Sequence, residues 1–78
     1  MIYPNPASGL ISILIFEPPL QPQLLRIYNL AGTLCSETQL EPGINFLQVP
    51  IKLKPGVYIA QVVFNKLIMF AQKLVVER

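Results

Sequence analysis

The side chains that could carry out catalysis are few in this chain of 78 residues, and they form no recognisable group. General acid/base catalysis needs a titratable pair held in position. The chain has no histidine and no aspartate, and its carboxylates are Glu17, Glu37, Glu41 and Glu77. Glu37 and Glu41 are close in sequence, but Glu37 falls in a strand pattern and Glu41 in a turn, so we interpret both as surface residues. We therefore expect no enzymatic activity.

The chain also lacks the residues that an activated nucleophile, a metal site or a cofactor site would need. Ser8 and Ser36 have no base to activate them, and Cys35 is the single cysteine, so neither a disulfide within the chain nor a cysteine-ligated metal site is possible. We interpret Cys35 as a small buried residue in a strand. Calcium needs several convergent oxygens, and a phosphate cradle needs a glycine-rich loop leading into a helix. We find neither pattern and expect no cofactor and no metal.

The composition narrows the possible partners. Hydrophobic residues make up 53% of the chain, charged residues 13%, and the net charge is +2. The cations are scattered: they are Arg26, Lys52, Lys54, Lys66, Lys73 and Arg78. Nucleic-acid binding needs a basic stripe, and a membrane span needs about 20 apolar residues in a row. We expect neither a nucleic-acid partner nor a membrane span, and a single domain over residues 1–78.

Prolines and glycines divide the sequence into short apolar runs without helical periodicity. Such runs at intervals of about 8–12 residues indicate a β-sandwich or barrel. The predicted strands are Leu10–Phe16, Leu24–Leu30, Thr33–Leu40, Ile44–Val49, Val57–Phe64 and Leu67–Val76. Pro18, Pro19 and Pro22 predict a stiff connector rather than a central strand. The chain is therefore predicted to be all-β, with six or seven strands.

Glycines mark three of the predicted turns. Glu41-Pro42-Gly43-Ile44 and Lys54-Pro55-Gly56-Val57 both have proline second and glycine third, the pattern of a type II turn. The third position of that turn has a positive φ, which glycine adopts without strain. Gly43 and Gly56 are therefore expected at positive φ, and Gly32 is expected to close another hairpin in the same way.

The last third of the chain predicts a β-hairpin that is apolar on both faces and reverses at Asn65-Lys66. A two-residue loop would place Leu67, Met69, Ala71 and Lys73 on the face of Tyr58. A three-residue loop would place Phe70, Gln72 and Leu74 there instead, because one residue of slip exchanges the two faces. We favour the three-residue loop, since it removes Lys73 from the Tyr58 face. The second apolar face then needs cover from within the domain or from a partner.

Four motifs in order give the chain a family resemblance. They are Tyr3-Pro-Asn-Pro-Ala-Ser-Gly9, Arg26-Ile-Tyr-Asn-Leu-Ala-Gly32, Leu53-Lys-Pro-Gly-Val-Tyr58 and Lys73-Leu-Val-Val76. In this order the chain resembles the type A C-terminal sorting domain of the type IX (Por) secretion system, over almost its whole length. The resemblance implies an immunoglobulin-like antiparallel β-sandwich at the end of a secreted precursor.

The resemblance also implies a function and partners. An upstream signal peptide would carry the precursor into the periplasm, since Met1 to Pro6 have no signal-peptide pattern. The outer-membrane translocon and its shuttle protein would recognise the domain, and a sortase-like cysteine protease would remove it. The cargo would then be released outside the cell or attached to anionic lipopolysaccharide at the cell surface.

Particular residues carry the family pattern. The positions are Pro4, Asn5, Pro6, Gly9, Gly32, Gly56, Tyr58, Lys73, Val75 and Val76. We expect Gly9, Gly32 and Gly56 to serve backbone geometry and Tyr58 to lie in the core with its hydroxyl bonded to the backbone. Lys73 and Arg78 are the candidates for contact with the secretion machinery. The chain departs from the family at Gln48-Val-Pro-Ile-Lys52, where members have Asp or Asn followed by Leu-Ser, and Pro50 should end or bulge its strand.

A second hypothesis comes from a different class. The chain could be a structural or adhesive β-sandwich module of a cell-surface protein that uses an exposed edge strand for strand addition or self-association. A sorting domain would be single and terminal in its precursor, whereas adhesive modules usually occur in tandem or internally.

Overall fold

Each of the six apolar runs predicted from the sequence contains a strand, although Phe16 and Ile44 of those runs lie outside the described residues. A computed structural model of the chain describes residues 2–3, 9–15, 22–43 and 45–77. Its strands are β1 (Ile2–Tyr3), β2 (Leu10–Leu14), β3 (Gln23–Asn29), β4 (Leu34–Leu40), β5 (Phe46–Pro50), β6 (Gly56–Phe64) and β7 (Leu67–Val76). The described residues contain no helix, and hence none that could cross a membrane. The additional strand, β1, was not among the predicted runs.

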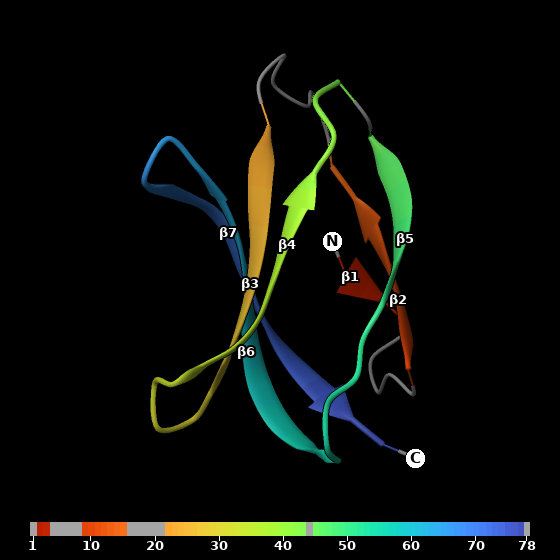
Figure 1. Ribbon diagram of the computed structural model, residues 1–78, viewed down its shortest axis with the longest axis vertical. Helices are drawn as coiled ribbons and strands as arrows, with labels where there is room; N and C mark the ends of the chain where they lie inside the picture. The colour runs from red at the N-terminus through yellow and green to blue at the C-terminus, as the bar shows by residue number, and fades with distance from the viewer. Residues whose placement is uncertain (1, 4–8, 16–21, 44, 78) are drawn as a thin grey trace.

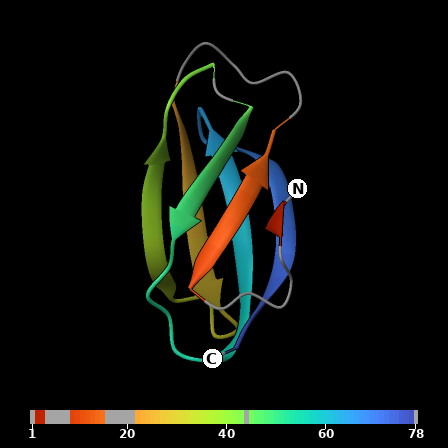
Figure 2. The ribbon, with the colours of Figure 1, turned by 90° about the vertical axis from the view of Figure 1, so that its right-hand side faces the viewer.

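The strands form two antiparallel sheets that face each other (Figures 1 and 2). One sheet has the order β1-β2-β5, and the other has the order β4-β3-β6-β7. The chain changes sheet between β2 and β3, between β4 and β5 and again between β5 and β6. Such crossings are typical of the Greek-key connections of immunoglobulin-like sandwiches. The prediction of an antiparallel β-sandwich is therefore confirmed.

Alternation along the strands builds the core. In β3, Leu25 and Ile27 are fully buried, whereas Leu24, Arg26 and Tyr28 are only partly buried on the opposite side. Side chains of a strand point alternately to its two faces, so this pattern directs one face inward. The core consists of Ile2, Ile11, Ile13, Leu25, Ile27, Leu40, Val49, Ile51, Tyr58, Ala60, Val62, Leu74 and Val76.

The C-terminal hairpin has the predicted strand pairing but a different turn. Tyr58 lies opposite Leu74 and Val62 lies opposite Phe70, as favoured from the sequence. The turn, however, has two residues, Asn65 (φ 52°) and Lys66 (φ 66°), and Phe64 pairs directly with Leu67. The extra residue is accommodated by a bulge between Val62 and Val63, where Met69 is left out of the pairing. The predicted three-residue loop is therefore wrong, and the bulge causes the shift in register instead.

Two of the glycine turns differ from their predictions. Gly43 has the expected positive φ, 73°, but Gly56 does not and instead begins β6, so the type II assignment of Lys54–Val57 is wrong. Gly32 has a φ of 87°, but it occupies the fourth position of its turn, where its N–H donates to the carbonyl of Asn29 at 3.0 Å. The Asn29 side chain accepts hydrogen bonds from the N–H groups of Ala31 and Thr33. It thus stabilises the backbone of this turn directly.

Two expectations about single residues have opposite outcomes. Cys35 was expected to be buried, but it is exposed on β4. This strand lies at the edge of its sheet, and Cys35 falls at an irregularity in the pairing with β3, where Ser36 and Leu34 pair with successive residues. Pro50 ends β5, as expected. The Pro18-Pro19 part of the predicted connector lies outside the described residues.

A side chain of β7 connects the two sheets. The N–H of Ile2 donates to Oε1 of Gln72 at 3.1 Å, and Nε2 of Gln72 donates to the carbonyl of Ile2 at 2.8 Å. The carboxamide thus pairs with β1 as a neighbouring peptide group would. We call these two bonds the Ile2–Gln72 clasp; Figure 2 shows β1 lying beside β7. The clasp explains how Gln72 can point toward the core and how a strand as short as β1 is held.

Replacing Gln72 by methionine should therefore destabilise the domain. The variant keeps the side-chain length but leaves the N–H and C=O of Ile2 without this partner, at a cost of about 1–3 kcal/mol in the free energy of unfolding. The same change at Gln61, on the other side of the sheet, should cost less than about 0.5 kcal/mol. Urea denaturation measures both values, and equal losses would contradict a structural role for the clasp.

Candidate docking surface

Most of the described family positions lie at one end of the sandwich. Tyr58 pairs with Asn29 beside the turn that contains Gly32, and Gly56 pairs with Val76. The carbonyl of Gly9 accepts a hydrogen bond from Ile51 at 2.9 Å, in the segment that leads to β6. Figure 1 shows the start of β6, the end of β7 and the β3–β4 turn together at the bottom of the molecule. We call this the motif end, defined by Gly9, Gly32, Gly56, Tyr58 and Val76. Pro4, Asn5, Pro6 and Arg78 lie outside the described residues.

Tyr58 fixes the corner where the chain passes from β5 to β6. Its side chain is buried, and its hydroxyl donates to the carbonyl of Lys54 at 2.7 Å. A tyrosine early in the sixth strand that bonds backbone a few residues upstream is the tyrosine corner of immunoglobulin-like sandwiches. The expected position and bonding of Tyr58 are therefore confirmed. The Leu53–Tyr58 motif stabilises the conformation of this corner, so its residues have a structural role.

Lys73 lies beside the motif end, but on the opposite face of the sheet from Tyr58. It is exposed on β7 and pairs with Ile59, which in turn pairs with Tyr28. These three residues form a row across the side of the four-stranded sheet that faces away from the other sheet, which we call the outer face. Val75 belongs to the same face and pairs with Val57, which is exposed. The structure thus places Lys73 and Tyr58, which belong to neighbouring pairs of the β6–β7 ladder, on opposite faces of the sheet.

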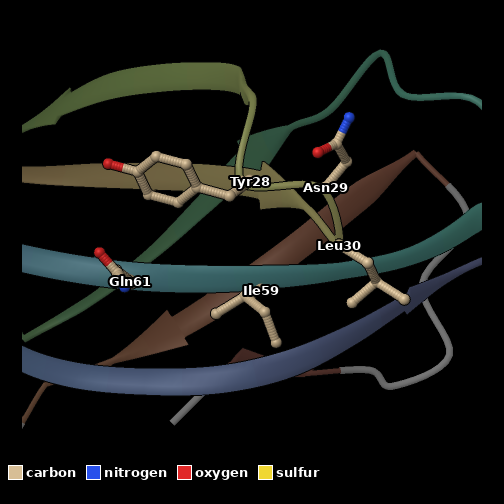
Figure 3. Close-up of a pocket in the computed structure, with 6 residues that line it drawn as sticks. Tyr28, Asn29, Leu30, Ile59 and Gln61 are labelled. Atoms are coloured by element: carbon tan, nitrogen blue, oxygen red, sulfur yellow. The ribbon is translucent and has the colours of Figure 1, made fainter.

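The outer face is hollowed along β3 and β6. A hollow of about 380 Å³ is lined by Tyr28, Asn29, Leu30, Gly32, Ile59 and Gln61. Figure 3 shows the side chains of Tyr28, Ile59 and Gln61 along neighbouring strands of this face. A second hollow of about 400 Å³ is lined by Pro22, Leu24, Arg26, Tyr28, Gln61, Val63, Asn65, Lys66 and Ile68. Tyr28 and Gln61 line both, so the two hollows adjoin and form one shallow trough.

The charges of the outer face are mainly positive. Nε of Arg26 donates to Oε2 of Glu37 at 2.8 Å, across β3 and β4, and both side chains are well exposed to water. The side-chain hydrogen bond with Glu37, followed by that with Tyr28, raises the pKa of Arg26 above its usual value, so the guanidinium stays charged. The β6–β7 hairpin contributes Lys66 and Lys73 and has no carboxylate between residues 56 and 76. The trough is therefore bordered by cations.

Sequence reasoning missed the ion pair and the trough. Arg26 and Glu37 are 11 residues apart, and only the register of β3 against β4 brings them together. In the part of the chain that the structure describes, no three histidine, cysteine, aspartate or glutamate residues lie together as a metal site would require. The trough of the outer face is apolar and bordered by positive charges, so it is suited to docking of a partner.

Comparison with known proteins gives one match. A family model described as a secretion system C-terminal sorting domain matches residues 1–77. No curated protein and no solved structure matches the chain.

Two glycines of the family pattern should differ in their tolerance of alanine. At Gly32, with a φ of 87°, alanine should cost about 1–2 kcal/mol of unfolding free energy, because an L-residue is strained in the left-handed region. At Gly56, an added Cβ would lie 3.6 Å from the Tyr58 ring, an ordinary contact without positive φ, so the loss should be below about 0.5 kcal/mol. Urea denaturation of both variants measures the difference. A larger loss at Gly56 would contradict this account.

The hydroxyl of Tyr58 should also contribute to stability. Tyr58→Phe keeps the ring in the core but leaves the carbonyl of Lys54 without its partner, which should cost about 1–2 kcal/mol. Tyr3→Phe is a matched control, because Tyr3 is 39% exposed and should change stability by less than about 0.5 kcal/mol. Thermal unfolding followed by circular dichroism compares the two. Indistinguishable melting temperatures would argue against a tyrosine corner.

Proposed function

The chain belongs to the family of secretion system C-terminal sorting domains, which serves the type IX secretion system, and on this premise we propose that it is a noncatalytic label. The label directs an upstream cargo across the outer membrane and is then cleaved off. The observation that carries the proposal is the family match over residues 1–77. The proposed domain is the whole of residues 1–78, at the C-terminus of a longer secreted precursor.

The N-terminal strand suits attachment of an upstream cargo. Ile2 is buried in the core, and the Ile2–Gln72 clasp holds its backbone against β7. A cargo joined ahead of β1 would therefore be anchored to both sheets of the sandwich. A force that draws the precursor through the secretion machinery would act first on β1 and the clasp, and through them on β7.

The outer face of the β6–β7 hairpin supports a role in recognition. We propose that the outer-membrane translocon and its shuttle protein bind this face, and that Lys73 and Arg78 contact them. The exposed side chains of Lys73 and Val57 and the partly buried Ile59 support this choice. These side chains form an apolar surface with one cation. When a partner docks on such a surface, its apolar area is buried and its cation can pair with a negative charge of the partner.

Removal of the label would complete the process. A sortase-like protease would cleave on the cargo side of the sandwich, and the cargo would pass from the periplasm to the outer membrane, the cell surface or the medium. The folded domain offers such a protease few cleavable sites in its strands, because their backbone hydrogen bonds protect them.

Export of a reporter tests the proposal. A periplasm-directed fluorescent protein fused ahead of this chain should leave the cell in a type IX-competent host and stay in the periplasm of a matched translocon-deficient strain. Lys73→Ala should lower the exported fraction roughly fivefold, the effect of losing about 1 kcal/mol of docking energy. Lys52→Ala is the control, because Lys52 is also exposed but precedes the Tyr58 corner.

The outcomes separate the two hypotheses. Export that is confined to the competent strain supports the sorting label, and equal export of the Lys73 and Lys52 variants would remove Lys73 from the contact. Retention of the folded fusion in both strains would contradict the sorting label and favour the structural or adhesive module. Circular dichroism of each purified variant establishes that it is folded.

A further inference from the structure

The tip of the C-terminal hairpin exposes three consecutive apolar side chains. Leu67, Ile68 and Met69 have exposed fractions of 63%, 59% and 55%. Within the described residues, they are the one consecutive run of large hydrophobic side chains that is exposed in this way. We call them the apolar tip. Single exposed hydrophobic residues are common on proteins, but a contiguous apolar patch usually indicates an interaction site.

The local backbone explains why all three are exposed. Regular alternation would turn either Ile68 or its two neighbours toward the core. Instead, the tight turn at Asn65-Lys66 is followed closely by the bulge at Met69, which interrupts the alternation. Figure 1 shows this end of the hairpin at the upper left, opposite the motif end. The apolar tip is therefore separate from the motif end.

The bulge also disfavours strand addition at this edge. A second chain that adds to a sheet needs evenly spaced N–H and C=O groups along the edge strand, and a bulge breaks that spacing. The partner should therefore contact side chains rather than the backbone of β7. A surface that can deform around the apolar tip meets this condition.

The charge near the apolar tip points to the chemistry of the partner. Lys66 is exposed in the turn directly before Leu67, and the hairpin contains no carboxylate from residue 56 to residue 76. A lysine stem can lie along an apolar surface while its ammonium group stays in water. At the surface of an anionic bilayer, exposed apolar side chains gain burial and a neighbouring cation gains about 1 kcal/mol of attraction.

We propose that the apolar tip binds the surface of an anionic lipid bilayer, with Leu67, Ile68 and Met69 among the upper acyl chains and Lys66 against the headgroup phosphates. The proposal does not depend on the function as an export label. It assigns the hairpin tip to lipid and leaves the part of the outer face around Lys73 and Ile59 for protein partners.

Vesicle binding of the purified 78-residue chain tests the proposal. The chain should sediment with mixed phosphatidylcholine and phosphatidylglycerol vesicles and bind vesicles of phosphatidylcholine alone more weakly. The double substitution Leu67→Gln and Met69→Gln should weaken binding about tenfold, because two partly inserted apolar side chains are lost. Ile68 is kept, since it pairs with Val63.

Two controls give the test its specificity. Leu30→Gln with Leu34→Gln removes two leucines that are 70% and 45% exposed near the motif end, and it should bind vesicles like the original chain. Lys66→Asn should weaken binding to the anionic vesicles, because asparagine tolerates positive φ but carries no charge. Lys52→Asn should leave it unchanged.

Two results would overturn the proposal. The first is absence of vesicle binding by the original chain, and the second is equal weakening by the tip and control leucine substitutions. If vesicle binding is absent, analytical ultracentrifugation without vesicles shows whether the chain self-associates. Self-association that the tip substitutions abolish would assign the apolar tip to contact between copies of the chain. Circular dichroism establishes that each variant is folded.

Discussion

The burial of one face of each sheet against the other is the constraint on which this structure depends. A chain of 78 residues buries only about 60–65% of the surface that it exposes when unfolded, so it can leave few inward positions unfilled. In β3, Leu25 and Ile27 lie in the core while Arg26 and Tyr28 face outward. A slip of one residue would exchange these sets and place a guanidinium in the core. The register of each strand is therefore set by its neighbours as well as by its own sequence.

This constraint explains the irregular hairpin. A two-residue turn without a bulge would place Lys73 on the Tyr58 side of the sheet, toward the core. The bulge at Met69 restores Phe70 and Leu74 to that side and moves Lys73 to the outer face. The correction also brings Gln72 inward, where its carboxamide is satisfied by the backbone of Ile2. The core, the clasp and the position of Lys73 thus follow from one irregularity.

The sequence was sufficient to predict the elements that depend on local pattern. Alternating apolar residues between prolines and glycines predicted the positions of six strands, and Pro42-Gly43 predicted its turn. β1 could not be predicted, because it has only two residues and depends on its pairing with β2 and on the bonds between Ile2 and Gln72, 70 positions away. Gly56 resembles Gly43 in sequence but begins a strand against the ring of Tyr58. For the candidate site, the favoured pairing of the hairpin correctly predicted the face on which Lys73 lies. The trough could not be predicted in this way, because it depends on the register of β3 against β6.

The division of the described family positions between the core and the outer face affects how the family pattern is interpreted. Tyr58 holds a corner, Gly9 and Gly32 adopt positive φ, and Val76 fills the core opposite Gly56. These residues would be needed for the fold even if the domain had no partner. A partner has to contact side chains that the fold leaves exposed, as Lys73 and the apolar tip are. Most of the family positions that the structure describes therefore specify the fold, and a partner would have to recognise the exposed side chains around them.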